Sequence, residues 1–153
     1  MSKTLLLAVL AAVLSGLAIG LQASLNGATG RNLGAVFTGL LVNVAGGAAA
    51  GLLLTFVLAR QGGLSSASLT APTLIQIVVS GLLGIGIIAG VSYALPKTGV
   101  AAGLSALIAG QMLVALVVDT FGLAGGPPIP VTLGRVAGLG LLALGTWALL
   151  PKG

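Results

Sequence analysis

The chain is built from long apolar runs separated by short segments that contain a charge, a proline or several glycines. Each run is close to the ~20 residues that a helix needs to cross ~30 Å of hydrocarbon. The runs cover residues 5–25, 34–59, 73–95, 100–121 and 132–150. The polar and apolar alternation of a membrane β-barrel strand is not seen. This pattern predicts an all-α integral membrane protein, with five transmembrane helices in a single membrane domain over residues 1–153.

The segments between the runs are short, which leaves no room for a soluble domain. They cover residues 27–32, 60–66, 96–99 and 125–130. Pro96 disfavours a helical Leu95, and Gly99 accepts unusual dihedral angles, so we expect a tight turn at 96–99. Three prolines make 125–130 the stiffest linker. A secretory signal is an alternative for the first run, but this run is longer than the usual 7–15-residue apolar core of a signal peptide.

Composition excludes most side-chain catalysis. The sequence is 58% hydrophobic and only 5% charged, whereas soluble domains carry about 25% charged residues. Cysteine and histidine are absent, which removes disulfides, thiolate and imidazole chemistry and the usual zinc ligands. Asp119 is the single acidic residue, so one chain cannot supply a pair of carboxylates. We therefore expect no enzyme, no metal site and no cofactor.

The positive charges are spread evenly along the chain. The six basic residues are Lys3, Arg31, Arg60, Lys97, Arg135 and Lys152. They form no cluster, and stacking aromatics are scarce, so a nucleic-acid partner is not expected. The bilayer is the expected partner, because single basic residues typically flank membrane segments.

Five crossings would place the two chain ends on opposite sides of the membrane and divide the basic residues equally. One side would carry Lys3, Arg60 and Arg135, and the other Arg31, Lys97 and Lys152. The positive-inside rule then gives no preferred orientation. The chain is either weakly oriented, or it inserts both ways and pairs with an opposed copy. Opposed copies with an odd helix number would mimic the inverted repeats found within many transporters.

Glycine is abundant, with 26 residues, many of them spaced four apart. Such pairs let helix backbones approach closely in lipid, where van der Waals contact drives association. The pairs are Gly16/Gly20, Gly47/Gly51, Gly86/Gly90, Gly99/Gly103 and Gly134/Gly138. They predict a tightly packed bundle.

Polar side chains inside the runs are candidates for a substrate path, because burying them in a bilayer costs free energy. The candidates are Gln22, Asn26, Asn43, Ser105 and Gln111. Gln22 and Asn26 are spaced i, i+4, which places both amides on one face of a helix. The alternative for each is a structural hydrogen bond across helices, contributing about 0.6 kcal/mol.

Asp119 lies at the end of the fourth run. It would cap the turn at Gly122 or form an ion pair with Arg135 on the same side of the membrane. A role in proton coupling is the alternative, and it would require desolvation of the carboxylate.

Five short motifs occur in one order: Gln22-Ala-Ser-Leu-Asn26, Leu95-Pro-Lys-Thr-Gly99, Gly110-Gln111, Asp119-Thr-Phe-Gly122 and Arg135-Val-Ala-Gly138. Their order and spacing resemble the YdcZ-like family of the drug/metabolite transporter superfamily, over nearly the whole chain. Thr120 departs from the family pattern, in which a histidine more often follows the aspartate. This departure counts against a role in proton transfer for the residues at the end of the fourth run.

The resemblance implies a half-size secondary transporter of the bacterial inner membrane. Family members look like dual-topology homodimers, opposed pairs of paralogues or fused ten-helix chains, so the partner would be a second copy or a paralogue. Cation exporters of the superfamily typically hold their substrate with a membrane-embedded glutamate, and this sequence contains none. A desolvated cation without a counter-charge is unfavourable, which favours a small neutral or anionic solute. A scaffold protein without transport and a passive pore for a small neutral solute are the alternatives.

Overall fold

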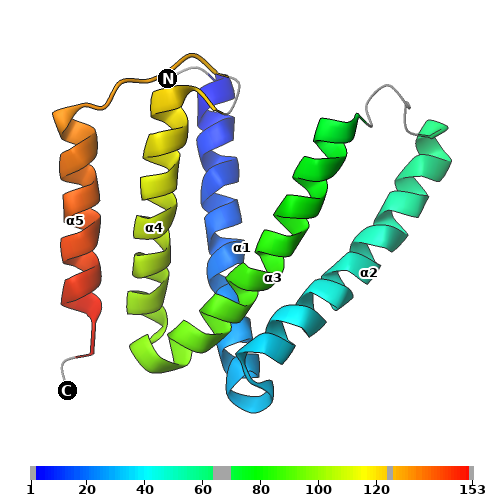
Figure 1. Cartoon of the computed structure of the whole chain (residues 1–153), viewed down its shortest axis with the longest axis horizontal. Helices are drawn as coiled ribbons and strands as arrows, with labels where there is room; N and C mark the ends of the chain where they lie inside the picture. Colours follow the sequence, from blue (N-terminus) through cyan, green and yellow to red (C-terminus); the bar gives the residue numbers. More distant parts are fainter. Residues whose placement is uncertain (1–2, 64–69, 124–125, 152–153) are drawn as a thin grey trace. The chain divides into compact units, whose positions relative to one another are not determined.

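The computed structural model describes residues 3–63, 70–123 and 126–151. Five α-helices make up most of this part of the chain (Figure 1). They are α1 (Lys3–Leu33), α2 (Ala35–Gln61), α3 (Ala71–Thr98), α4 (Val100–Phe121) and α5 (Leu133–Leu149). The all-α prediction is thus confirmed.

The helices belong to two compact units. Unit 1 consists of Met1–Ser24 and Ala94–Gly153, and unit 2 consists of Leu25–Tyr93. The long helices α1 and α3 contribute to both units, because each passes through a boundary between them. A single membrane domain over residues 1–153 stays a prediction.

Two helix junctions consist of one glycine each. Gly34 joins α1 to α2 with φ 79° and ψ 157°, and Gly99 joins α3 to α4 with φ 78° and ψ 156°. Only glycine adopts this region without strain. At each junction the glycine N–H donates to the carbonyl one turn before it, and its own carbonyl accepts from the N–H one turn after it. The chain therefore reverses at each glycine while the N–H and C=O of that glycine both stay paired.

The predicted break at 27–32 is wrong, because α1 continues through it to Leu33. The turn predicted at 96–99 is confined to Gly99, which has the expected positive φ, because residues 96–98 are helical. Residues 27–32 contain glycine, threonine and asparagine, which lower helix propensity without forbidding a helix. Pro96 lies inside α3, close to its end. A proline there removes one hydrogen bond, to the carbonyl of Ser92, and α3 continues to Thr98. The predicted break at 60–66 also begins too early, because α2 includes Arg60 and Gln61. Residues 64–66 lie outside the described chain.

α4 and α5 pack against each other in unit 1 and run in opposite directions (Figure 1). Gly122 ends α4 in the left-handed conformation and donates to carbonyls of the last turn. Residues 126–132 are non-helical, as the prolines predict, and Ile129 N–H donates to the carbonyl of Asp119. Gly125 lies outside the described residues. Thr132 caps α5 by accepting a hydrogen bond from the Arg135 N–H.

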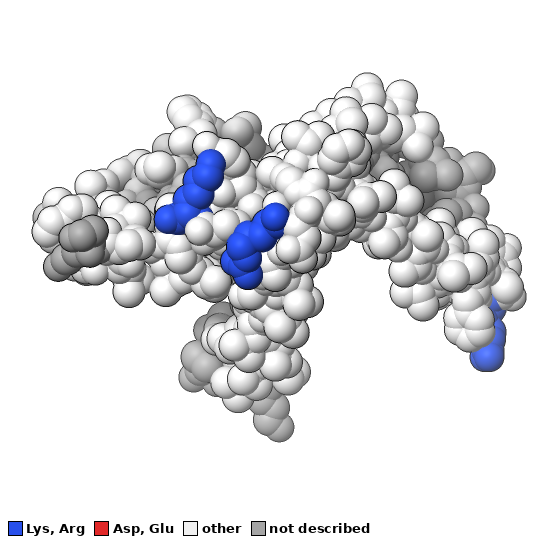
Figure 2. Space-filling model, turned by 90° about the horizontal axis from the view of Figure 1, so that it is seen from below, with Lys and Arg blue, Asp and Glu red and all other residues white. Residues whose placement is uncertain are grey.

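The outer surface of the helices is apolar. α1 to α4 are each long and apolar enough to cross a membrane, and α5 is a shorter apolar helix. Its 17 residues correspond to about 25 Å of helix. Leucines such as Leu52 and Leu133 are 74% and 86% exposed, and most of the face in Figure 2 is neither acidic nor basic. An exposed apolar surface of this kind requires lipid or another protein.

Most glycines predicted to pack helices face open space within this chain. A Cβ built on Gly16, Gly47, Gly51, Gly86, Gly90 or Gly138 would meet no atom of a neighbouring helix within 4 Å, as far as the chain is described. Gly20 and Gly134 have one neighbour each, at 4.0 and 3.9 Å. Their role in packing therefore stays a prediction.

Candidate functional site

A close helix contact in unit 2 is made by two glycines that are not among the predicted pairs. A Cβ on Gly30 in α1 would lie 2.6 Å from the backbone oxygen of Ser92 in α3. A Cβ on Gly39 in α2 would lie 2.9 Å from the backbone oxygen of Ile85, also in α3. Both distances are shorter than real Cβ contacts, so only glycine fits at these positions.

Pro96 explains why the carbonyl of Ser92 is available at this contact. Proline has no N–H, so the Ser92 carbonyl has no donor four residues later in its own helix. This carbonyl faces Gly30 instead. The side chain of Ser92 is 2% exposed, and its Oγ has no hydrogen-bond partner. α3 thus presents a carbonyl and a hydroxyl with unused hydrogen-bonding capacity in the interior of unit 2.

Two further polar side chains are buried in unit 2. Asn26 is 5% exposed and Thr38 is 0% exposed. The Thr38 hydroxyl donates to the carbonyl of Gly34 at 2.8 Å, whereas no hydrogen bond joins the Asn26 amide to another described residue. Buried polar groups are normally paired, and an unpaired one indicates a functional role or a bound water or ligand.

Asn43 is half-buried on α2, next to the same part of α3. Its Nδ2 donates to the carbonyl of Gly39 at 2.8 Å. Its Oδ1 lies 3.2 Å from the position that a Cβ on Gly84 would take. The amide thus bonds its own helix through the nitrogen and presents its oxygen to α3, where a hydrogen-bond donor could approach it.

The other predicted path residues belong to unit 1. Gln22 on α1 and Gln111 on α4 are exposed, and Ser105 on α4 is half-buried. Gln22 and Asn26 do lie one turn apart on the same helix, with the first exposed and the second buried. The structure brings Asn26 and Asn43 into unit 2 and leaves the other three in unit 1. Their roles in a substrate path stay predictions.

Asp119 and Arg135 meet between α4 and α5. Arg135 Nη2 donates to Asp119 Oδ2 at 3.0 Å, and the side chains are 32% and 40% exposed respectively. The Nη1 of Arg135 is shielded from solvent and has no partner. An ion pair this exposed contributes little to stability, about 0–1 kcal/mol. The pair does bring two opposite charges together, one near the C-terminus of α4 and one near the N-terminus of α5.

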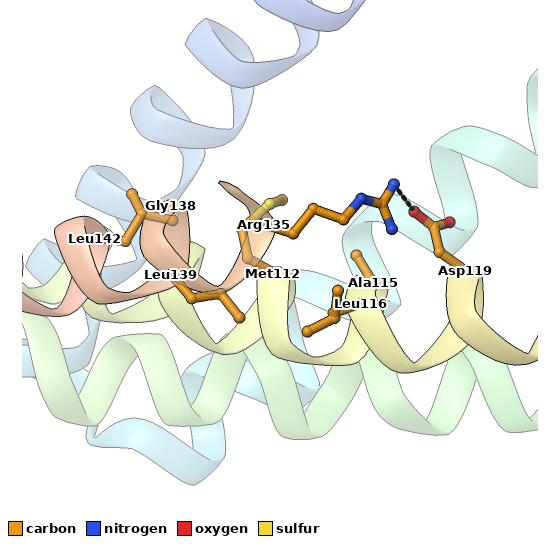
Figure 3. Close-up of a pocket in the computed structure, with 8 residues that line it drawn as sticks. All are labelled: Met112, Ala115, Leu116, Asp119, Arg135, Gly138, Leu139 and Leu142. Carbon is orange, nitrogen blue, oxygen red and sulfur yellow. Dashed lines mark hydrogen bonds and ion pairs between the residues drawn. The ribbon is translucent and has the colours of Figure 1, made fainter. Parts of the chain in front are cut away.

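A groove of about 300 Å³ runs from this ion pair along α4 and α5 (Figure 3). The residues that line it are Met112, Ala115, Leu116 and Asp119 of α4, and Arg135, Gly138, Leu139 and Leu142 of α5. The two charged residues stand at one end, and the remaining side chains make the rest of the groove apolar.

Comparison with known families identifies the chain. The family model described as "Putative inner membrane exporter, YdcZ" matches residues 7–148. The chain belongs to this YdcZ family. Neither a curated protein nor a solved structure matches it. The match also fixes the location as the inner membrane, where the apolar helices make this YdcZ protein a multi-pass membrane protein.

The YdcZ assignment describes an exporter, which is not a class of enzyme. Among the residues that the structure describes, no group of three or more acidic, histidine or cysteine side chains could hold a metal ion. The buried polar groups of unit 2 are the best candidates for a solute site, because they combine burial with unused hydrogen-bonding capacity.

Thr38 and Ser92 are not among the residues predicted from the sequence. A helical serine or threonine can satisfy its hydroxyl on the carbonyl one turn earlier, so its identity says nothing about burial. One sequence feature does point to Ser92, namely its position four residues before Pro96. That spacing leaves its carbonyl without the usual helical donor.

Proposed function

We propose that this YdcZ protein is a half-size, dual-topology secondary transporter that moves a small neutral or anionic solute across the inner membrane. Two opposed copies would form the working unit, and each would contribute the polar groups of its unit 2 to the solute path. A copy of a related chain could replace one partner.

The distribution of basic residues over the helix ends carries this proposal. Arg31, Arg60 and Lys97 lie in the last turns of α1, α2 and α3. Lys3 lies at the start of α1 and Arg135 in the first turn of α5, so five crossings would alternate these charges between the two membrane faces. Such a chain has no excess charge that would hold one orientation.

The packing of α5 supports the fifth crossing that the proposal requires. α5 runs antiparallel to α4 and packs along it. α4 is long enough to cross a membrane, so a neighbour that returns along it crosses in the opposite direction. Thr132 and Leu150, the residues flanking α5, are extended and add length at each end. The difference between its 17 residues and a longer span is small enough for local bilayer thinning.

The surface of the chain supports a partner. Glycines on α1, α2 and α3 have open space where a side chain would be, and their helices expose leucine, valine and isoleucine. Close approach of glycine-bearing faces is the usual basis of helix association in lipid. An opposed copy would cover such faces and would duplicate each polar group of unit 2.

The available chemistry favours a solute without a positive charge. Asn26, Ser92 and Asn43 offer amide and hydroxyl groups, which both donate and accept hydrogen bonds. No acidic side chain lies among them, because the sequence has Asp119 alone. A desolvated cation would lack a counter-charge there.

Transport is tested by measuring flux through the purified protein in liposomes, with a panel of small neutral, anionic and cationic metabolites. We expect saturable counterflow of one neutral or anionic solute. Unsaturable flux would instead indicate a pore, and no flux with any solute would indicate a scaffold. Saturable counterflow of a cation alone would contradict the charge argument.

The same assay tests Asn43. Asn43→Leu removes the amide oxygen that faces α3, and we expect at least about a tenfold loss of counterflow, the effect of one or two lost hydrogen bonds. Thr55→Val on the same helix is the control, because Thr55 is exposed and its hydroxyl donates to its own helix. Equal activity of the two variants would place the solute elsewhere.

A further inference from the structure

The α4–α5 groove is amphipathic along its length. Its residues on α4 are spaced i, i+3, i+4 and i+7, and those on α5 follow the same spacing, so each set lies on one face of its helix. Asp119 is the last of the α4 set and Arg135 the first of the α5 set. Because the helices are antiparallel, the charged pair marks one end (Figure 3). The apolar end lies about 10 Å away, seven residues before Asp119 in α4 and seven residues after Arg135 in α5.

The position of the charged end matches the headgroup level of a bilayer. Asp119 lies in the last turn of α4, and Arg135 lies in the first turn of α5. Ends of membrane helices lie near the interface, and their middles lie among acyl chains. The groove thus leads from the headgroup region into the hydrocarbon.

The guanidinium of Arg135 has fewer acceptors than it can use. It carries five N–H donors, and Asp119 Oδ2 accepts from Nη2 only. Nη1 has no partner, and no hydrogen bond to Nε appears within the described chain. On the other side of the pair, Asp119 Oδ1 accepts no hydrogen bond from a described residue. Nε of Arg135 and Oδ1 of Asp119 are therefore open to a second group of opposite charge, whereas Nη1 is shielded from solvent.

We propose that this groove binds one phospholipid with a zwitterionic headgroup, phosphatidylethanolamine. The phosphate accepts hydrogen bonds from Arg135, the ammonium group approaches Asp119, and one acyl chain lies along Met112, Leu139 and Leu142. Arginine suits phosphate because its planar fork can bind two acceptors at once. The open space at Gly138 leaves room for the chain.

Charge complementarity selects this headgroup over an anionic one. The Asp119–Arg135 pair has no net charge, and an anionic lipid would bring its phosphate close to the carboxylate without a cation to offset it. A zwitterionic headgroup supplies both signs, one for each member of the pair. The proposal concerns unit 1 alone and does not rest on transport or on the opposed dimer.

The acyl-chain part is tested by native mass spectrometry of protein released from nanodiscs that contain equal amounts of phosphatidylethanolamine and phosphatidylglycerol. We expect the unmodified chain to retain phosphatidylethanolamine. Gly138→Leu fills the groove, and we expect it to lower the retained lipid about tenfold. Gly140→Leu is the control, because Gly140 lies on another face of α5 and also has open space around it. Equal retention by both variants would overturn the proposal.

The headgroup part uses variants that keep the groove open. Arg135→Gln is expected to lose most of the bound phosphatidylethanolamine, and Asp119→Asn is expected to shift retention toward phosphatidylglycerol. Preferential retention of phosphatidylglycerol by the unmodified chain, or retention of neither lipid, would overturn the assignment. Because the readout is a bound mass, failure here is distinguishable from failure of the transport proposal.

Discussion

Gly30→Ala is expected to separate α1 from α3 and to lower the free energy of unfolding by about 3 kcal/mol, the upper range for overpacking. The new Cβ would lie 2.6 Å from the Ser92 carbonyl oxygen and 2.8 Å from its Cβ. A backbone oxygen cannot rotate away as a flexible side chain can, so the helices themselves must move apart. Thermal unfolding of the purified protein in detergent measures the loss.

The control for this prediction is Gly46→Ala on α2, where a Cβ meets nothing within 4 Å. There the change removes only the flexibility of glycine, which favours the helix by about 1 kcal/mol. The two substitutions make the same chemical change. Because their surroundings differ, their effects on the free energy of unfolding should have opposite signs. If Gly30→Ala is as stable as Gly46→Ala, the close contact between α1 and α3 does not exist.

The second large effect is expected from variants that unbalance the positive charges. Arg31→Gln with Gln61→Lys leaves four basic residues on the Lys3 side and two on the other, and Arg60→Gln with Asn32→Lys reverses this ratio. The positive-inside rule predicts that each variant inserts in a single orientation, and that the two orientations are opposite. Each variant alone should lose nearly all pairing, and coexpression should restore it.

Copurification of differently tagged copies measures this pairing. Arg31→Lys with Arg60→Lys is the control, because it changes both sites and keeps the charges three against three. We expect the control to pair like the unmodified chain. Strong self-pairing of either unbalanced variant would show that opposed orientations are not required.

The sequence was sufficient to predict the helices but not where α1, α2 and α3 end. Apolar runs of this length are stable in lipid only as helices or closed barrels, because backbone groups must be paired internally. The ends were misplaced because glycine, threonine and even Pro96 near a helix end are compatible with a helix. What stops α1 and α3 is a positive φ at Gly34 and Gly99, and many other glycines in this chain remain helical.

The candidate site was predictable only in part, for a related reason. Asn26 and Asn43 are amides within apolar runs, which makes them visible, and the structure buries or half-buries both. The burial of Thr38 and Ser92 depends on the contact among α1, α2 and α3, which no local pattern reveals. Likewise, the backbone of another helix approaches closely at Gly30 and Gly39, which are not among the predicted pairs, whereas Gly103 of the predicted Gly99/Gly103 pair lies close to the side chains of Leu95 and Thr98.

The alternation of charges allows the Asp119–Arg135 pair to be foreseen, since both residues belong to the same side of the membrane. The structure shows the contact at 3.0 Å. The groove that runs from this pair along α4 and α5 could not be foreseen, because it depends on which faces of the two helices meet.

The central claim, that one chain inserts in both orientations, is tested most directly by two reporters fused to the C-terminus of the unmodified protein. One is a phosphatase active only outside the cytoplasm, and the other is a fluorescent protein that matures only inside it. Opposed copies require comparable, strong activity from both fusions at equal expression. Strong activity from one fusion and background from the other would contradict the claim.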